Sequence, residues 1–194
     1  RLERTLAGEV TMRLRVGSQA PSFEVTALGG APVSLEALRG KTVLLKFYRF
    51  ATCPVCNLHM HHFVKEYPSL EEAGLTTIAF FHSPQAKVEA SNDKMTPFDL
   101  VADPDKRVFK LYGVETGWRG FFSPAVMRDY IRAMRAGYDP GFFTSDGGMR
   151  GNPADFIIDA DGTIRLAHYG DHYADSLTAS EVLQELKSLG PTHA

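Results

Sequence analysis

The pattern of apolar and polar positions alternates between short apolar runs and segments with helical spacing. The first clear run, Val43 to Phe50, is apolar or aromatic apart from Lys46 and Arg49. It is too short for an isolated helix and a break follows it, so it predicts a buried strand. Pro54 then marks the start of a helix, because its missing N–H would be unsatisfied there in any case and its φ is already helical. The pattern therefore predicts a strand that leads directly into a helix.

The same alternation continues on both sides of this junction. The other apolar runs before residue 115 predict strands over Phe23 to Ala27, Thr76 to Phe81 and Phe98 to Ala102. Helices are predicted over Leu35 to Leu38, from about Gln85 to Met95, and between Asp103-Pro104 and Gly113. The helix from Pro54 is predicted to kink or restart at Pro68 and to end at Gly74. Strands that alternate with helices predict a mostly parallel sheet with right-handed crossovers.

The C-terminal part of the chain has a different pattern. Two apolar runs, 156–159 and 163–169, flank the turn Asp161-Gly162 and predict a β-hairpin. Thr178 and Glu181 form a capping box, which predicts a last amphipathic helix.

A segment rich in glycine and aromatic residues lies between residues 115 and 149, around a helix that Ser123-Pro124 starts. Core elements resume after it, so we expect a single domain over residues 1–194 with an insertion at about 115–149. Exposed aromatic residues on such an insertion indicate a lid, a ligand groove or a subunit contact. The alternative is a helical flap that packs on its own domain.

Composition and charge are those of an ordinary globular protein, with 44% hydrophobic residues, 23% charged residues and a net charge of -2. Neither nucleic acid nor an anionic membrane surface is expected as a partner. No apolar run approaches the ~20 residues of a membrane span, and the N-terminal residues lack a signal-peptide core. The chain does not begin with methionine, so a removed targeting segment stays open. Two cysteines without a wider disulfide framework favour a reducing cytoplasm.

Those two cysteines, Cys53 and Cys56, lie at the junction of strand and helix. With Pro54 as the first helical residue, Cys53 is the N-cap and Cys56 the third helical residue. A thiolate there faces free backbone N–H groups and the positive end of the helix dipole, which lower its pKa. We therefore expect reactive, solvent-accessible sulfurs that can cycle between dithiol and disulfide.

Three other interpretations of the cysteine pair stay open. The two side chains could be inert core residues or a static disulfide, although a bridge that closes so small a loop stabilises little. Cys53 and Cys56 with His59 or His62 have a ligand-like spacing, but a structural zinc usually needs a second cysteine or histidine pair. No metal or cofactor is therefore expected. His59, one turn after Cys56, could instead tune the sulfur.

The chain resembles the peroxiredoxin-like alkyl hydroperoxide reductase / thiol-specific antioxidant (AhpC/TSA) family. The resemblance rests on Val16-Gly17, Ala20-Pro21 with Phe23, Gly40-Lys41, the segment from Tyr48 to Cys56, Leu111 to Val114, and Phe156 to Asp159 with Asp161-Gly162. It covers most of the chain outside the insertion. The resemblance implies a thioredoxin-like α/β fold of peroxiredoxin type, in which a central mixed sheet lies between two layers of helices.

The resemblance also implies roles for individual residues. In the family a Phe-Tyr-Pro stretch leads to a Thr-x-Val-Cys motif, whose cysteine attacks the peroxide and falls on Cys56 here. The threonine position is Cys53, which is the position of the nucleophile in thioredoxins. The family's motif proline is replaced by Arg49. The arginine expected before Phe156 is replaced by Pro153, which looks like the cis-proline beside a thioredoxin disulfide.

A guanidinium near the sulfur would stabilise the charge that develops during peroxide reduction, and Arg49 or Arg150 could supply it. The alternative is that Arg49 pairs with a carboxylate and Arg150 is a solvated loop residue.

The resulting hypothesis is a thiol peroxidase that reduces hydrogen peroxide or organic hydroperoxides. Cys56 would attack the peroxide, Cys53 would form a disulfide with it, and an external thioredoxin-like or glutathione-like dithiol would restore the pair. The chain could also form a homodimer. One alternative is a thioredoxin-like disulfide reductase with Cys53 as the nucleophile. Another is a metal-binding or carrier protein that uses both cysteines and a histidine.

Overall fold

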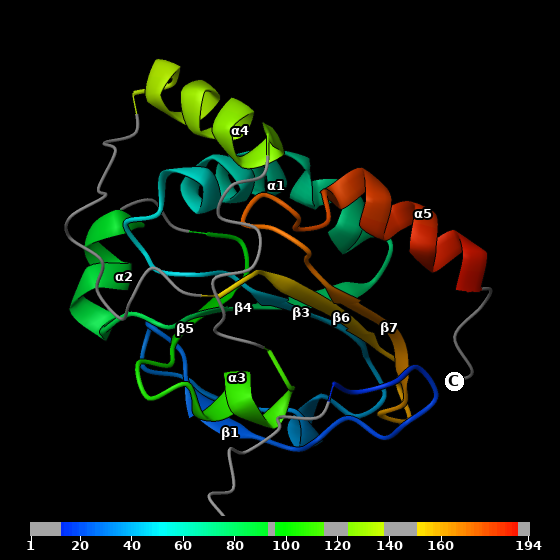
Figure 1. Cartoon of the computed structure of the whole chain (residues 1–194). Helices are drawn as coiled ribbons and strands as arrows, with labels where there is room; N and C mark the ends of the chain where they lie inside the picture. Colours follow the sequence, from blue (N-terminus) through cyan, green and yellow to red (C-terminus); the bar gives the residue numbers. More distant parts are fainter. Residues whose placement is uncertain (1–12, 93–95, 115–123, 138–150, 190–194) are drawn as a thin grey trace, which may run out of the picture.

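The computed structural model describes residues 13–92, 96–114, 124–137 and 151–189. Its centre is a five-stranded sheet with the strand order β5-β4-β3-β6-β7 (Figure 1). The strands are β3 (Thr42–Phe47), β4 (Leu75–Phe81), β5 (Asp99–Ala102), β6 (Ala154–Ile158) and β7 (Ile164–Tyr169). The first three are parallel, β6 pairs antiparallel with β3, and β7 pairs antiparallel with β6. The expected mixed sheet and C-terminal hairpin are confirmed.

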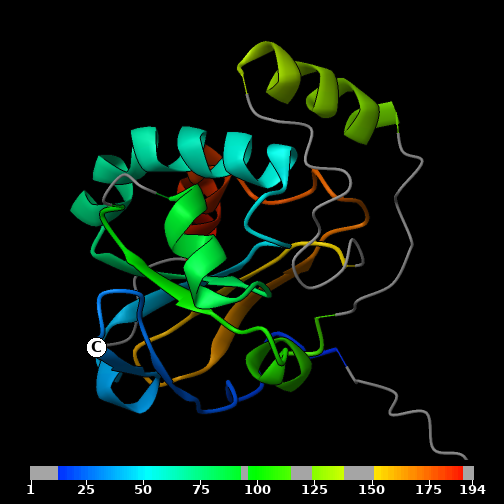
Figure 2. The same ribbon diagram turned by 90° about the vertical axis from the view of Figure 1, so that its left-hand side faces the viewer.

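Helices cover both faces of this sheet, which confirms the three-layer, thioredoxin-like arrangement. One face carries the helices α1 (Pro54–Glu72), α4 (Pro124–Arg135) and α5 (Ala179–Leu189), with α4 outermost on α1 (Figure 2). The other face carries α3 (Arg107–Leu111), the hairpin of β1 (Glu24–Thr26) and β2 (Pro32–Ser34), and the short 3-10 helix η1 (Glu36–Leu38). The helix α2 (Gln85–Ser91) lies beside β5. No helix in the described part of the chain is long and apolar enough to cross a membrane.

Strand β3 divides two cores because its side chains alternate between the two faces of the sheet. Val43, Leu45 and Phe47 belong to the core on the α3 side, where six aromatic rings pack together. Leu44 belongs to the core beneath α1, and Lys46 lies on that same face, 4.5 Å from the centre of the Phe63 ring. A strand that is buried on both sides explains the nearly continuous apolar run in the sequence.

Several local predictions are confirmed and a few need correction. Thr178 and Glu181 form the expected capping box, because each backbone N–H is bonded to the other residue's side chain. The helix predicted at Ser123-Pro124 begins at Pro124, whereas residues 115–123 and 138–150 lie outside the described residues. Helix α1 does not restart at Pro68 but continues to Glu72. Helix α2 ends at Ser91 rather than near Met95.

Candidate redox site

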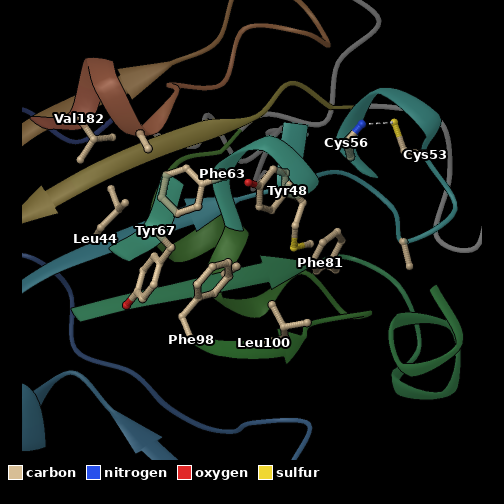
Figure 3. Close-up of a cluster of buried hydrophobic side chains, with 14 of the residues drawn as sticks. Leu44, Tyr48, Cys53, Cys56, Phe63, Tyr67, Phe81, Phe98, Leu100 and Val182 are labelled. Atoms are coloured by element: carbon tan, nitrogen blue, oxygen red, sulfur yellow. Dashed lines mark hydrogen bonds between the residues drawn. The ribbon is translucent and has the colours of Figure 1, made fainter. Parts of the chain in front are cut away.

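The two cysteines lie at the first turn of α1, immediately after the loop that leaves β3. Cys53 is the N-cap with φ -69° and ψ 114°, and Pro54 is the first helical residue, both as predicted. The backbone N–H of Cys56 donates a hydrogen bond of 3.4 Å to the Cys53 sulfur (Figure 3). The loop is held by the segment that follows β4, because the N–H of Ala51 donates to the Ser83 hydroxyl at 2.9 Å.

Both cysteines are reduced and nearly inaccessible to solvent. The exposed fraction is 1% for Cys53 and 3% for Cys56. The prediction of solvent-accessible sulfurs is therefore wrong. The sequence places both residues at a helix end, which is often exposed, but it does not reveal which distant segments cover that end.

Arg49 and Tyr173 are two of the residues beside the Cys53 sulfur. The Arg49 Nη1 group donates a hydrogen bond to Cys53 Sγ at 3.6 Å, so of the two alternatives for Arg49 the structure has the guanidinium beside a sulfur, that of Cys53. The guanidinium carbon lies 3.4 Å from the centre of the Tyr173 ring. Both side chains are only 4% exposed. Tyr173 is a site residue that the sequence analysis missed, because it comes from the loop between β7 and α5 and no motif surrounds it.

These contacts give the two thiols opposite ionisation. Burial alone would raise the pKa of Cys53, but the hydrogen bond from the Cys56 thiol, the charge of Arg49 and backbone N–H groups lower it to about 6. Burial and donation of a hydrogen bond to Cys53 raise the pKa of Cys56 well above its usual value. Of the two sulfurs, Cys53 therefore loses its proton more readily than Cys56. These directions are the reverse of what a nucleophilic Cys56 would need.

The other predicted site residues have different surroundings. His59 Nε2 lies 3.7 Å from an Asp129 carboxylate oxygen of α4, and burial lowers the pKa of His59. Its side chain lines a cavity of about 630 Å³ between α1, α4 and the start of α5. Arg150 lies outside the described residues.

Pro153 does not have the predicted cis peptide bond, because the described residues contain no cis peptide bond. Asn152 and Pro153 instead continue the pairing of β6 with β7, since the Pro153 carbonyl accepts from Gly170 N–H at 2.9 Å. The Asn152 side-chain amide also donates to the Gly170 carbonyl at 2.7 Å. Continued strand pairing accounts for the extended trans chain here.

A buried ion pair lies on the α1 face of the sheet and was also missed. Lys46 Nζ lies 2.5 Å from Asp155 Oδ1, with exposed fractions of 1% and 0% for the two side chains. Lys46 also donates to the Leu177 carbonyl, and Asp155 accepts from the Leu177 N–H. Both charges therefore have several polar partners within the core.

A metal centre finds no support in the described residues, where no group of three or more His, Cys, Asp or Glu side chains is arranged to hold an ion. The metal-binding alternative therefore has no ligand set among them.

Comparison with known proteins agrees with a thiol redox site. The sequence model of the AhpC/TSA family matches residues 16–167. The chain belongs to the AhpC/TSA family. It is accordingly a peroxiredoxin-like thiol oxidoreductase, and the predicted family and enzyme class are confirmed.

Similar proteins fall into two groups by name. A Mycobacterium tuberculosis protein named as a peroxiredoxin is 27% identical over 160 residues, which are 82% of this chain and 87% of that protein. The thiol-disulfide oxidoreductase ResA of Bacillus thuringiensis is 30% identical over 104 residues, which are 53% of this chain and 60% of ResA. The reduced 2-Cys peroxiredoxin of Plasmodium vivax superposes with a TM-score of 0.66 at 19% identity, over 90% of this chain and 81% of the other. The last comparison supports the fold alone.

Proposed function

We propose that the protein is a thiol peroxidase in which Cys53 attacks the peroxide and Cys56 completes the disulfide. The observation that carries this proposal is the geometry at the buried Cys53 sulfur, which accepts hydrogen bonds from Arg49 Nη1 at 3.6 Å and from the Cys56 N–H at 3.4 Å. These contacts lower the pKa of Cys53 to about 6. The thiolate, not the thiol, is the nucleophile in such chemistry. We therefore propose Cys53 as the attacking residue, in place of Cys56.

The reaction proceeds in three balanced steps. The Cys53 thiolate forms an S–O bond with one peroxide oxygen, the O–O bond breaks, and the leaving oxygen takes a proton from water to give an alcohol or water. Cys53 is now a sulfenic acid. The Cys56 sulfur attacks it, an S–S bond forms, and hydroxide leaves with the Cys56 proton as water. An external dithiol then reduces the disulfide by exchange and becomes oxidised itself.

Arg49 contributes to the first step in two ways. Its positive charge keeps Cys53 ionised, and its N–H groups lie next to the oxygen that becomes negative as the O–O bond breaks. A charge placed in advance beside a buried reacting atom stabilises the transition state more strongly than it would in water. A role for Arg150 remains a prediction.

Burial of the pair favours a peroxide over a protein disulfide as the substrate. In the reduced state, attack on a protein disulfide along the S–S axis would need an exposed sulfur, whereas a peroxide is small enough to enter a closed site. The later exchange with the external dithiol takes place in the oxidised protein and requires the disulfide to become accessible. The second candidate, a disulfide reductase, is favoured by one observation, the low pKa of the first cysteine of the pair. The homodimer and the cytoplasmic location remain predictions.

The test uses the Cys53→Ser and Cys56→Ser variants, treated with one equivalent of hydrogen peroxide and analysed by mass spectrometry. We expect Cys56→Ser to form one sulfenic acid on Cys53, and Cys53→Ser to stay unoxidised. The wild type should form the disulfide between the two cysteines. Oxidation of Cys56 in the Cys53→Ser variant would return the attacking role to Cys56. If the wild-type protein does not react with peroxides but reduces a protein disulfide, the disulfide-reductase function is correct and the peroxidase function is not.

A further inference from the structure

The loop between β7 and α5 carries Tyr173 to the redox site, and its own contacts fix its shape. The Asp171 N–H donates to the Asp175 carboxylate at 2.8 Å, and His168 Nε2 lies 3.3 Å from the same carboxylate. At the start of the loop only glycine fits at position 170, because a Cβ there would lie 2.5 Å from the Asp175 carbonyl oxygen. Tyr173 is therefore presented by a tightly folded loop.

The Tyr173 ring covers one face of the Arg49 guanidinium, 3.4 Å from its central carbon. A guanidinium donates hydrogen bonds only in its plane, so a ring stacked on one face leaves the in-plane N–H groups for other partners. One of these groups, Nη1, donates to Cys53. A long arginine side chain loses much rotamer freedom when it is held in one orientation, so the packed ring must help to hold it.

Tyr173 also lies within electrostatic reach of the sulfur. Burial raises the pKa of Tyr173, Arg49 lowers it and the charge of Cys53 raises it. The guanidinium of Arg49 thus contacts both other side chains, with the Tyr173 ring on one of its faces and the Cys53 sulfur at its edge.

We propose that Tyr173 is the positioning residue that orients Arg49 toward Cys53 and that closes the site to bulky hydroperoxides. The first part concerns the ionisation of Cys53 and does not depend on the substrate. The second part rests on the proposed peroxidase function. Loss of the ring would free Arg49 to turn away from the sulfur and would open space beside it.

Two variants separate the ring from its hydroxyl. Tyr173→Leu keeps an apolar side chain but removes the aromatic face, and Tyr173→Phe keeps the face. Tyr67→Leu is the matched control, because Tyr67 is a tyrosine of similar burial that packs on Phe63 and Phe98 instead of Arg49. All proteins are studied reduced, after circular dichroism confirms that they are folded.

The first readout is the pH midpoint of the Cys53 thiolate, followed by its ultraviolet absorbance. We expect a midpoint near pH 6 for the wild type, Tyr173→Phe and Tyr67→Leu, and a midpoint about one unit or more higher for Tyr173→Leu. An unchanged midpoint in folded Tyr173→Leu would overturn the positioning role. A midpoint raised equally in Tyr173→Phe would also overturn it, because the hydroxyl and not the ring would then be responsible.

The second readout is the rate of reaction with hydrogen peroxide and with cumene hydroperoxide. Tyr173→Leu should lose about 10-fold in rate with hydrogen peroxide at neutral pH, because Arg49 no longer faces the developing charge. The ratio of the cumene hydroperoxide rate to the hydrogen peroxide rate should rise in this variant alone. An unchanged ratio contradicts the closing role. A wild type that reacts with neither peroxide removes the peroxidase proposal, whereas the absorbance midpoint still tests the positioning role.

Discussion

Lys46 and Arg49 are two buried cations only three positions apart, and they have different partners. Lys46 lies in β3 and contacts the carboxylate of Asp155 and a backbone carbonyl. Arg49 lies in the loop after β3 and contacts the sulfur of Cys53 and the ring of Tyr173.

The charges of Lys46 and Arg49 act on different groups. A buried lysine that is fully paired with a carboxylate contributes to the fold and its charge is already neutralised. Arg49 instead lowers the pKa of the Cys53 thiol, which is a weak acid in water. Its positive charge therefore favours the reactive thiolate form of Cys53. Burying a cation is costly at both positions, but Lys46 stabilises the fold whereas Arg49 tunes a reactive sulfur.

The largest effect is expected from Asp155→Ala, which leaves Lys46 buried without its carboxylate. The free energy of unfolding should fall by about 3–5 kcal/mol in urea denaturation, as for other broken buried pairs. The Cys53 midpoint should stay near pH 6. Asp129→Ala is the control, since Asp129 pairs with the exposed Arg128 and Arg132 and its loss should cost less. Equal losses in the two variants would contradict a special role for the Lys46 pair.

Arg49→Met should act on reactivity more than on stability. Without the positive charge, the pKa of Cys53 should rise by about 1–3 units, and the rate with hydrogen peroxide should fall by about 100-fold. Arg49→Lys should have a Cys53 pKa and a rate between those of the wild type and Arg49→Met, because a lysine keeps the charge but offers no planar group to stack on Tyr173. Stopped-flow measurement of the rate against pH gives both numbers. A wild-type rate profile in Arg49→Met would mean that Arg49 does not tune the sulfur.

A smaller effect is expected in the pH dependence of stability. The pKa of Cys53 is about 6 in the folded protein and about 8.5 in an unfolded chain. A lowered pKa contributes stability that is fully present above pH 8.5 and is lost as the pH falls through 6. The difference in unfolding free energy between the wild type and Cys53→Ser should therefore shrink from about pH 8 to about pH 5.5. Urea denaturation under reducing conditions measures it, and a flat difference would argue against a thiolate.

The smallest effect is expected from Ser176→Ala. The Ser176 hydroxyl lies 3.4 Å and 3.5 Å from the two oxygens of Asp155, which already have Lys46 and the Leu177 N–H as closer partners. We expect a loss of about 0.5–1 kcal/mol in unfolding free energy. A loss as large as that of Asp155→Ala would show that the hydroxyl, and not Lys46, holds the carboxylate.

The sequence predicted those parts of the fold whose cause lies within a few residues. Pro54 fixes the start of α1 and thereby makes Cys53 the N-cap, and Thr178 with Glu181 fixes the start of α5. The order of strands and helices follows from the same local patterns. The restart suggested by Pro68 does not occur, because the helix packs well enough on the sheet to continue through a residue that lacks an N–H.

Only those residues of the candidate site that lie close together in the sequence could be predicted. Cys53, Cys56 and Arg49 lie within one segment, and their proximity follows from the strand-to-helix junction. Tyr173 and Asp155 reach the same region from more than 100 positions away, as the separation of 109 positions between Lys46 and Asp155 illustrates. The burial of the sulfurs depends on such distant contacts, so no local pattern could reveal it. The reversed order of the two pKa values comes from Arg49 and the hydrogen bond between Cys56 and Cys53, whose geometry the sequence alone does not give.

The ion pair between Lys46 and Asp155 also bears on how the chain finds its fold. The two residues lie directly opposite each other in the antiparallel pairing of β3 with β6. A slip of one residue would set Lys46 against Ala154 or Phe156 and would turn Asp155 toward the aromatic core on the other face. Both charges would then be buried apart, so a one-residue slip of these two strands is incompatible with a compact state. The ion pair thus favours the observed strand register, at a contact that joins the two halves of the chain.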